Sequence, residues 1–195
     1  MKLTQKHKPD PVQNRGEHFS MPQAKQEHKR PTGLVKQKII ADDLRALVGI
    51  MTITFGAAAI GIIFGANSSA DWYVSLIKPT WTPPENVYAP VWTLLYLLMG
   101  FAAWRVYRKR KTHDIRPAML FYHLQLLFNV LWCVFFFGLR NPALALADAM
   151  ILQLFIISSA ASFFQVDRPA AAMLIPYMSW VAFAICLNCF IWVAN

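Results

Sequence analysis

Residues 46–66 decide the fold: they read ALVGIMTITFGAAAIGIIFGA and hold no ionisable side chain in 21 positions. A helix of about 20 apolar residues crosses a hydrocarbon core of about 30 Å. The stretch does not alternate apolar and polar residues with a period of two, which excludes a spanning β-strand. Inside lipid its backbone can be satisfied only as a helix. We therefore predict a transmembrane helix here.

Four further stretches share this character. Residues 86–104 and 169–195 carry no charged side chain, 117–139 carries only His123 as a titratable group, and 141–166 carries only Asp148. The predicted fold is all-α, an integral membrane bundle of five transmembrane helices at about 44–66, 84–107, 117–139, 142–165 and 169–193. We place a tail at residues 1–40 and the bundle at 41–195.

The tail is basic and offers little to bury. Residues 1–45 hold ten of the nineteen Lys and Arg residues and five of the ten acids. Such a segment is expected to be disordered, here to about Lys36. It has no secretory signal core, and its acids argue against a mitochondrial presequence. A basic arm can bind nucleic acid, but the adjoining membrane accounts for the charge, so no nucleic-acid partner is expected.

The basic residues also predict the orientation. With five spans, the tail, the 105–116 connection and Arg168 place seventeen Lys and Arg residues on one side, against Lys78 and Arg140 on the other. Basic residues gather on the cytosolic side of membranes. We expect a multi-pass protein with a cytosolic N-terminus.

Three helices carry polar and aromatic residues on one face. The spacings of three or four positions are those of helical neighbours. The residues are Trp92 and Tyr96, then Gln125, Asn129 and Trp132, then Trp180, Ala184 and Asn188. Amides face away from lipid, so the stripes point into the bundle. They either join helices by hydrogen bonds or line a ligand cavity.

Other polar residues give weaker indications. Asp148 is expected to be neutral, paired or close to water. His123 has no partner at ligand spacing, and the three cysteines, all in apolar segments, match no zinc site, so we predict no metal centre and no disulfide. Gly61 and Gly65 form a GxxxG pair that suits close helix contact within the bundle or in a homodimer.

The 67–84 connection is longer than the others. It holds Trp72, Tyr73 and Trp81 together with three prolines. Fixed proline angles favour a structured cap over a slack linker. An aromatic belt at the membrane interface is the alternative, and the two are compatible.

The same residues resemble a known family. The run Lys78-Pro79-Thr80-Trp81-Thr82-Pro83-Pro84, followed by Pro90-Val91-Trp92 and Tyr96, is similar to the tryptophan-rich sensory protein/translocator protein family, also known as peripheral benzodiazepine receptors. The likeness continues through Gln125, Asn129, Trp132, Asp148 and Trp180 to Asn188. It covers about residues 46–195 and leaves out the tail.

The resemblance implies a five-helix protein that binds tetrapyrroles, notably protoporphyrin IX or haem, as ligands rather than required cofactors. The implied ligand-binding residues are Tyr73, Trp92, Tyr96, Gln125, Asn129, Trp132, Trp180, Ala184 and Leu187. Lys78 and Arg140 are the basic residues on the side of the long loop, and we expect them at the pocket mouth, near the ligand's propionates. The resemblance also implies a homodimer.

The animal cholesterol motif is not intact in this chain. Cys189 stands where that motif has a tyrosine, and Val193 where it has an arginine. The motif is a weak pattern even when complete. Its missing side chains argue against cholesterol as the ligand.

Three functions remain open from the sequence. The favoured one is a membrane receptor or sensor that influences porphyrin trafficking or a stress response. A second is a porphyrin-degrading enzyme, since the resemblance implicates Trp92 and Trp180 in light-dependent breakdown. A third is a porphyrin or sterol transporter, although the sequence shows no inverted repeat of that kind. A bacterial membrane is favoured, with the mitochondrial outer membrane and plant secretory membranes as alternatives.

Overall fold

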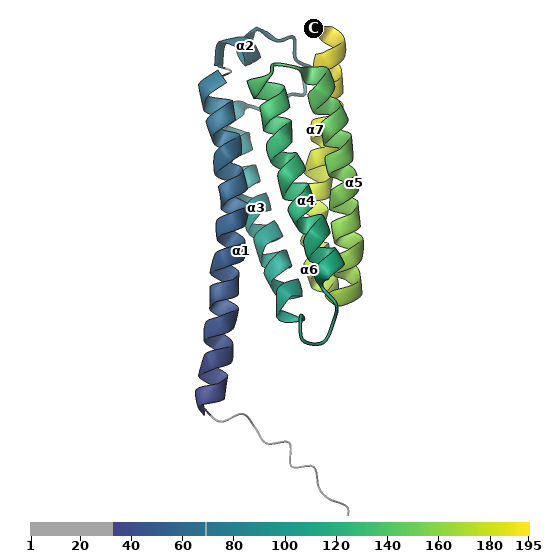
Figure 1. The fold of residues 1–195 in the computed structure, drawn as a ribbon. Coiled ribbons are helices and arrows are strands. Elements are labelled where there is room, and N and C mark those ends of the chain that lie inside the picture. Colours follow the sequence, from purple (N-terminus) through teal and green to yellow (C-terminus); the bar gives the residue numbers. More distant parts are fainter. Residues whose placement is uncertain (1–32, 69) are drawn as a thin grey trace, which may run out of the picture.

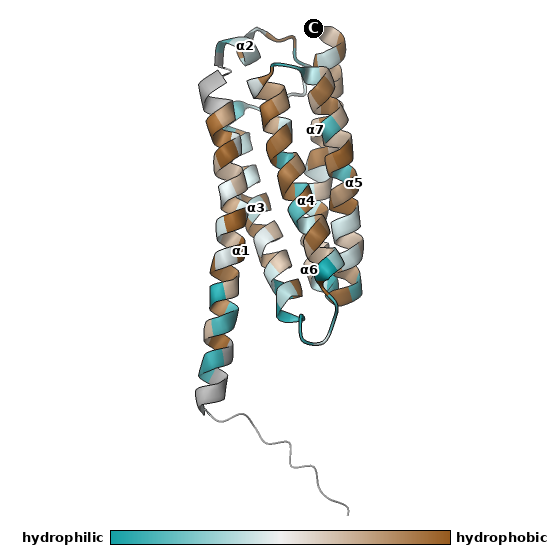
Figure 2. Ribbon diagram, in the orientation of Figure 1, coloured by the Kyte–Doolittle hydropathy of each residue, from teal (hydrophilic) through white to brown (hydrophobic). Residues whose placement is uncertain are grey.

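A computed structural model of the chain describes residues 33–68 and 70–195. Within this part, five helical stretches are long and apolar enough to cross a membrane: Ile40–Phe64, Glu85–Arg108, Arg116–Gly138, Pro142–Val166 and Arg168–Ala194. The predicted all-α membrane bundle is therefore confirmed. Figure 2 shows apolar residues along the bundle and hydrophilic ones gathered on the lower turns of α1 and around the α3–α4 connection.

The helices run antiparallel and side by side (Figure 1). They are α1 (Gly33–Ser68), α2 (Ala70–Ser75), α3 (Glu85–Arg108), α4 (Arg116–Cys133) with the π-helical turn η1 (Val134–Gly138), α5 (Pro142–Val166), α6 (Arg168–Ala172) and α7 (Ile175–Ala194). We name the two ends of the bundle for what they carry. The α2 end holds α2 and the C-terminus, and the basic end holds the α3–α4 connection and α6.

The first helix begins earlier than expected. Residues 33–43, which we placed before the span, belong to α1. Contacts with α3 hold this segment, because Trp104 Nε1 donates to the Asp43 carbonyl at 2.9 Å and Arg108 pairs with the Asp43 carboxylate at 3.2 Å. The predicted disordered tail otherwise falls on residues 1–32, outside the described residues.

The last span is two helices, α6 and α7, where the sequence suggested one. Pro176 lies at the start of α7. A proline has no backbone N–H, and its ring clashes with the carbonyl four residues earlier, so it belongs to the first turn of a helix. The chain accordingly turns at residues 173–174 between Ala172 and Ile175.

Helix packing leaves space on one side of the bundle. α4 packs along α5, α5 along α7, and α1 along α3, whereas α3 makes few contacts with α7. The small residues Ala102 and Ala103 are fully buried in the core, where α3 meets its neighbours closely. This arrangement separates α3 from α7 and leaves room for a cavity.

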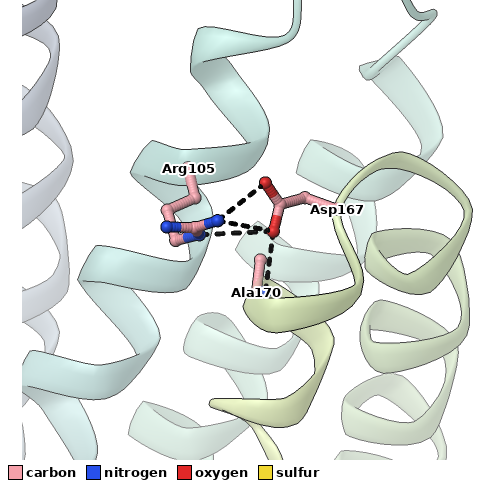
Figure 3. A network of polar contacts seen from close by, with 3 residues as sticks. All are labelled: Arg105, Asp167 and Ala170. Atoms are coloured by element: carbon pink, nitrogen blue, oxygen red, sulfur yellow. Dashed lines mark hydrogen bonds and ion pairs between the residues drawn. The ribbon is translucent and has the colours of Figure 1, made fainter.

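An ion pair fastens the basic end (Figure 3). Arg105 of α3 binds the Asp167 carboxylate through Nε at 3.2 Å and Nη2 at 3.1 Å. The same carboxylate accepts from the Ala170 backbone N–H at 3.0 Å and so caps α6. Asp167 therefore joins α3, α5 and α6 at one point.

We expect Asp167→Ala to lower the free energy of unfolding by about 1–3 kcal/mol, because an N-cap and a charged hydrogen-bond acceptor are lost together. Denaturation in mixed detergent micelles measures this. Asp114→Ala is the matched control. Its pair with Arg116 is solvent-exposed, with side-chain exposures of 65% and 91%, and so is the hydrogen bond that its carboxylate accepts from the Arg116 backbone N–H at 3.1 Å. Its removal should therefore change stability by less than about 1 kcal/mol. Equal losses in the two variants would contradict the assignment.

Candidate functional site

A cavity of about 650 Å³ lies in the half of the bundle next to the α2 end. Small-molecule sites commonly enclose about 300–1,000 Å³ with mostly apolar walls and a few polar groups. The walls come from α1, α2, α3, α4, η1 and α7. The aromatic lining residues are Phe55, Tyr73, Tyr88, Trp92, Tyr96, Trp132, Phe136, Phe137, Trp180 and Phe183.

The aromatic rings of the walls brace one another. Trp132 stacks on Phe136 of η1, with ring centroids 4.9 Å apart and planes 13° apart. Trp92 lies 5.7 Å from the Tyr96 ring, one turn along α3. The π-helical turn adds a residue to its turn and carries Phe136 and Phe137 into the lining. Large flat faces held in this way offer contact area to a planar apolar ligand.

A buried amide network closes the cavity toward the core. Tyr96 donates its hydroxyl hydrogen to Asn129 Oδ1, and Asn129 Nδ2 donates to the Tyr177 hydroxyl oxygen at 3.1 Å. Asn129 is 4% exposed and Tyr177 is 0% exposed. A buried amide without partners would cost free energy, so this network fixes the orientation of three side chains from α3, α4 and α7.

A second amide holds the wall near the α2 end. Trp132 Nε1 donates to Asn188 Oδ1 at 3.1 Å, and Asn188 Nδ2 donates to the Pro142 carbonyl at 2.8 Å. Asn188 therefore links α4, α5 and α7 while presenting part of its surface to the cavity. The same side chain thus joins helices by hydrogen bonds and lines the cavity.

The long connection forms the cap that the sequence predicted. Its helix α2 lies across the end of the bundle (Figure 1) and contributes Tyr73 and Val74 to the lining. Asn195, at the C-terminal end of α7, exchanges hydrogen bonds with the backbone of Ile77 at 3.0 and 3.2 Å. The cap is thus tied to the far end of the chain.

Lys78 caps α2 and lies beside the cavity. Its Nζ donates to the carbonyls of Tyr73, Val74 and Leu76. The same ammonium lies 4.5 Å from the centroid of the Tyr73 ring. Burial raises the pKa of the Tyr73 phenol above its ordinary value; the nearby Tyr88 hydroxyl opposes that shift and the negative charge of Glu85 adds to it. Tyr73 is therefore a neutral hydrogen-bonding group at neutral pH.

The structure brings all but one of the predicted ligand-binding residues to this cavity. Those that line it are Tyr73, Trp92, Tyr96, Asn129, Trp132, Trp180, Ala184 and Leu187. Gln125 does not. It lies one turn nearer the basic end, is fully buried, and its Nε2 lies 4.0 Å from Met99 Sδ. Residues that share a helix face differ in depth, and the Asn129 network separates Gln125 from the cavity.

The two basic residues expected at the mouth are placed differently. Lys78 contacts the lining residue Tyr73 without itself belonging to the lining. Arg140 is exposed in the connection between η1 and α5, with a positive φ of 51°. It too lies outside the lining.

The remaining polar candidates lie apart from the cavity, with one exception. Asp148 is 3% exposed on α5, and neither of its carboxylate oxygens has a hydrogen-bond partner among the described residues. His123 is exposed, with Nδ1 2.6 Å from the Met119 carbonyl. Cys133 lines the cavity, and a Cβ added at Gly61 would lie 3.1 Å from its Sγ, so Gly61 serves close packing of α1 on α4 within the bundle.

Several lining residues were missed from the sequence. Glu85, Tyr88 and Ala89 lie one and two turns before Trp92 on the same face of α3. Helical spacing from Trp92 could have found them. Phe55, Ala58 and Ile62 of α1 are apolar or small, so nothing in the sequence distinguishes them from residues that face lipid.

The fold and the cavity define a class: a polytopic α-helical membrane protein with a partly open, aromatic-walled cavity beneath a structured cap. The model of the TspO/MBR family matches residues 49–193. The chain belongs to the TspO/MBR family.

Individual relatives agree with the family assignment. The tryptophan-rich protein TspO of Chlorobaculum tepidum is 35% identical over 129 residues, covering 66% of this chain and 82% of the relative. The tryptophan-rich sensory protein of Cereibacter sphaeroides is 42% identical over 118 residues, covering 60% and 73%. The human translocator protein is 33% identical over 138 residues, covering 70% and 82%. The resemblance inferred from the motifs is confirmed.

Proposed function

We propose that this protein is a membrane receptor that binds a tetrapyrrole, such as protoporphyrin IX or haem, in the cavity beneath α2. The observation that carries the proposal is the set of indole and phenol faces on one cavity of about 650 Å³. A flat macrocycle gains most of its affinity from such faces, and amides or hydroxyls set its orientation. Occupancy of the cavity would report porphyrin levels to the cell through the cap.

The mouth supports a further part of this proposal. Protoporphyrin IX carries two propionates, which need cationic or donor partners close to water. Lys78 lies against the Tyr73 ring at the cap, and Arg140 lies in a connection at the same end of the bundle. We assign both residues to the propionates, with Lys78 as the nearer one.

We expect Lys78→Gln together with Arg140→Gln to weaken protoporphyrin IX binding about three- to tenfold at low ionic strength, since partly exposed charges are screened by water and salt. The Soret band shift on titration measures the affinity. Protoporphyrin dimethyl ester is the matched ligand, because it keeps the macrocycle and lacks both charges. An equal loss for acid and ester would show that the substitutions disturb the cap. Unchanged affinity for the acid would refute the assignment.

We also propose the membrane arrangement. The basic end would face the cytosol, because Lys and Arg gather there and cytoplasmic loops are enriched in them. In that orientation, the α2 end with its cap faces the non-cytosolic side of the membrane. A bacterial membrane and a homodimeric state are the assignments we favour.

A second candidate function, light-dependent porphyrin breakdown, is favoured by one feature. Trp92 and Trp180 line the same cavity, so a bound macrocycle would lie within reach of two oxidisable indoles. Illuminating the protein–porphyrin complex in air and following the Soret band tests this. Bleaching that depends on the protein and persists in Trp92→Phe with Trp180→Phe would exclude a role for the indoles.

A further inference from the structure

The cavity has one feature that a dianionic porphyrin does not use. Among the lining residues within 33–68 and 70–195, Glu85 is the one that carries a formal charge. It opens α3 and is solvent-exposed, so it lies at the mouth, where the cavity meets solvent. A carboxylate at this place disfavours propionates and favours a cation.

Aromatic rings surround the same place. Tyr88 lies one turn after Glu85, and its ring meets that of Trp180 edge-on at 6.0 Å. Trp180 lies 5.5 Å from Phe183, which in turn meets Trp81 of the cap at 5.6 Å. The rings come from α3, α7 and the long connection. They form a continuous aromatic rim beside the carboxylate.

The charge of Glu85 also influences the aromatic residue Tyr73 at the mouth. Besides burial, which raises the pKa of the Tyr73 phenol, the Tyr88 hydroxyl lowers it and the negative charge of Glu85 raises it, so both groups lie close enough to Tyr73 to influence it. Lys78 shows that an ammonium is already accommodated at 4.5 Å from a ring of this mouth. That ammonium is held by three carbonyls of α2, so its position is fixed on the cap side of Tyr73. Tyr88 and Trp180, in contrast, both belong to the cavity lining.

A carboxylate beside several aromatic faces is the arrangement that recognises alkylated ammonium groups, because ring quadrupoles attract a weakly hydrated cation. The rest of the cavity is apolar and reaches down to Tyr96 and Asn129. We propose that Glu85, Tyr88 and Trp180 bind the ammonium head group of an amphiphile whose apolar body occupies the cavity. This inference rests on the cavity as the binding site of the proposed function, though not on a tetrapyrrole as its ligand.

Dodecyltrimethylammonium and its uncharged isostere, in which a tert-butyl group replaces the trimethylammonium, test the proposal. Calorimetric titration of the full-length protein in an uncharged maltoside detergent avoids competing choline head groups. We expect the cation to bind about tenfold more tightly than the isostere. Glu85→Gln should remove most of this preference. Asp71→Asn is the control, because Asp71 is an exposed acid on α2 outside the lining, and it should keep the preference.

Protoporphyrin IX is titrated in parallel. Its affinity should rise about two- to fivefold in Glu85→Gln, because one repulsive charge is removed. Equal binding of the cation and the isostere to the wild type, no binding of the cation, or an undiminished preference in Glu85→Gln would each overturn the proposal. If the porphyrin fails to bind while the cation preference is found, the tetrapyrrole function fails and this inference stands.

Discussion

Asn129→Leu should lower the free energy of unfolding by about 2–3 kcal/mol. The substitution keeps the side-chain volume but leaves the buried hydroxyls of Tyr96 and Tyr177 without their partner. Each orphaned buried group costs about 1–3 kcal/mol in a protein interior. Two such groups would cost about 2–6 kcal/mol together. Measured interhelical hydrogen bonds in membranes average only about 0.6 kcal/mol, so we expect a loss near the lower end of that sum.

The triple variant Asn129→Leu, Tyr96→Phe and Tyr177→Phe is the decisive comparison. Replacing all the partners by apolar groups of similar shape removes the desolvation cost along with the hydrogen bonds. Its stability should recover most of the loss seen in Asn129→Leu. Unfolding in mixed detergent micelles measures both variants. A single variant as stable as the wild type, or a triple variant less stable than the single one, would contradict the network's structural role.

Trp132→Ala should weaken protoporphyrin IX binding about 10- to 100-fold. It removes a flat wall that stacks on Phe136 at 4.9 Å and deprives Asn188 Oδ1 of its donor. Losing a central aromatic anchor of a binding site costs about 2 kcal/mol or more, and 1.4 kcal/mol corresponds to a factor of ten. The Soret band shift gives the affinity.

Trp104→Ala is the matched control for Trp132. Trp104 is also a partly buried indole with a hydrogen bond, donated to the Asp43 carbonyl at 2.9 Å. It lies on α3 outside the cavity lining. Its removal should leave porphyrin affinity within about twofold of the wild type, since no direct contact is lost. Equal losses in both variants would show that the effect comes from general destabilisation.

The sequence predicted the bundle well because lipid leaves the backbone little choice. Every uncharged stretch of about 20 residues had to become a helix, and the five spans were found. The ends were less accurate. The start of α1 depends on tertiary contacts of Asp43 with α3, and the break before α7 depends on where Pro176 falls within its helix. Neither follows from hydropathy.

The candidate site was predictable where polar residues marked a helix face. Amides and indoles in lipid need hydrogen-bonding partners, which is why the sequence indicated Asn129, Trp132 and Asn188. Gln125 is also an amide on this face, but it lies in the core below the cavity. Helical spacing predicts which face a residue lies on, but not its position along the bundle relative to the cavity. The apolar residues of α1 that line the cavity resemble those that face lipid. Only the packing of α1 on α4, closed by Gly61 against Cys133, distinguishes them.

Glu85 shows how the fold adds chemistry that the motifs do not contain. In the sequence it is an acid in the first turn of a helix, where its negative charge interacts favourably with the positive end of the helix dipole. The fold also places it in the lining of an aromatic cavity. The mouth therefore carries a carboxylate from α3 and, on the cap, an ammonium from Lys78. Ligands with either sign of charge can find a partner there.

Two alanines of α7 test most directly whether the cavity binds the ligand. Ala184 lines the cavity, whereas Ala182, two residues earlier, is exposed on the outer face of the same helix. Phenylalanine at 184 would fill the space a macrocycle needs, while phenylalanine at 182 would face lipid. On Soret titration with protoporphyrin IX, we expect Ala184→Phe to lose at least about 100-fold in affinity and Ala182→Phe to bind like the wild type. Undiminished binding by Ala184→Phe would contradict the account.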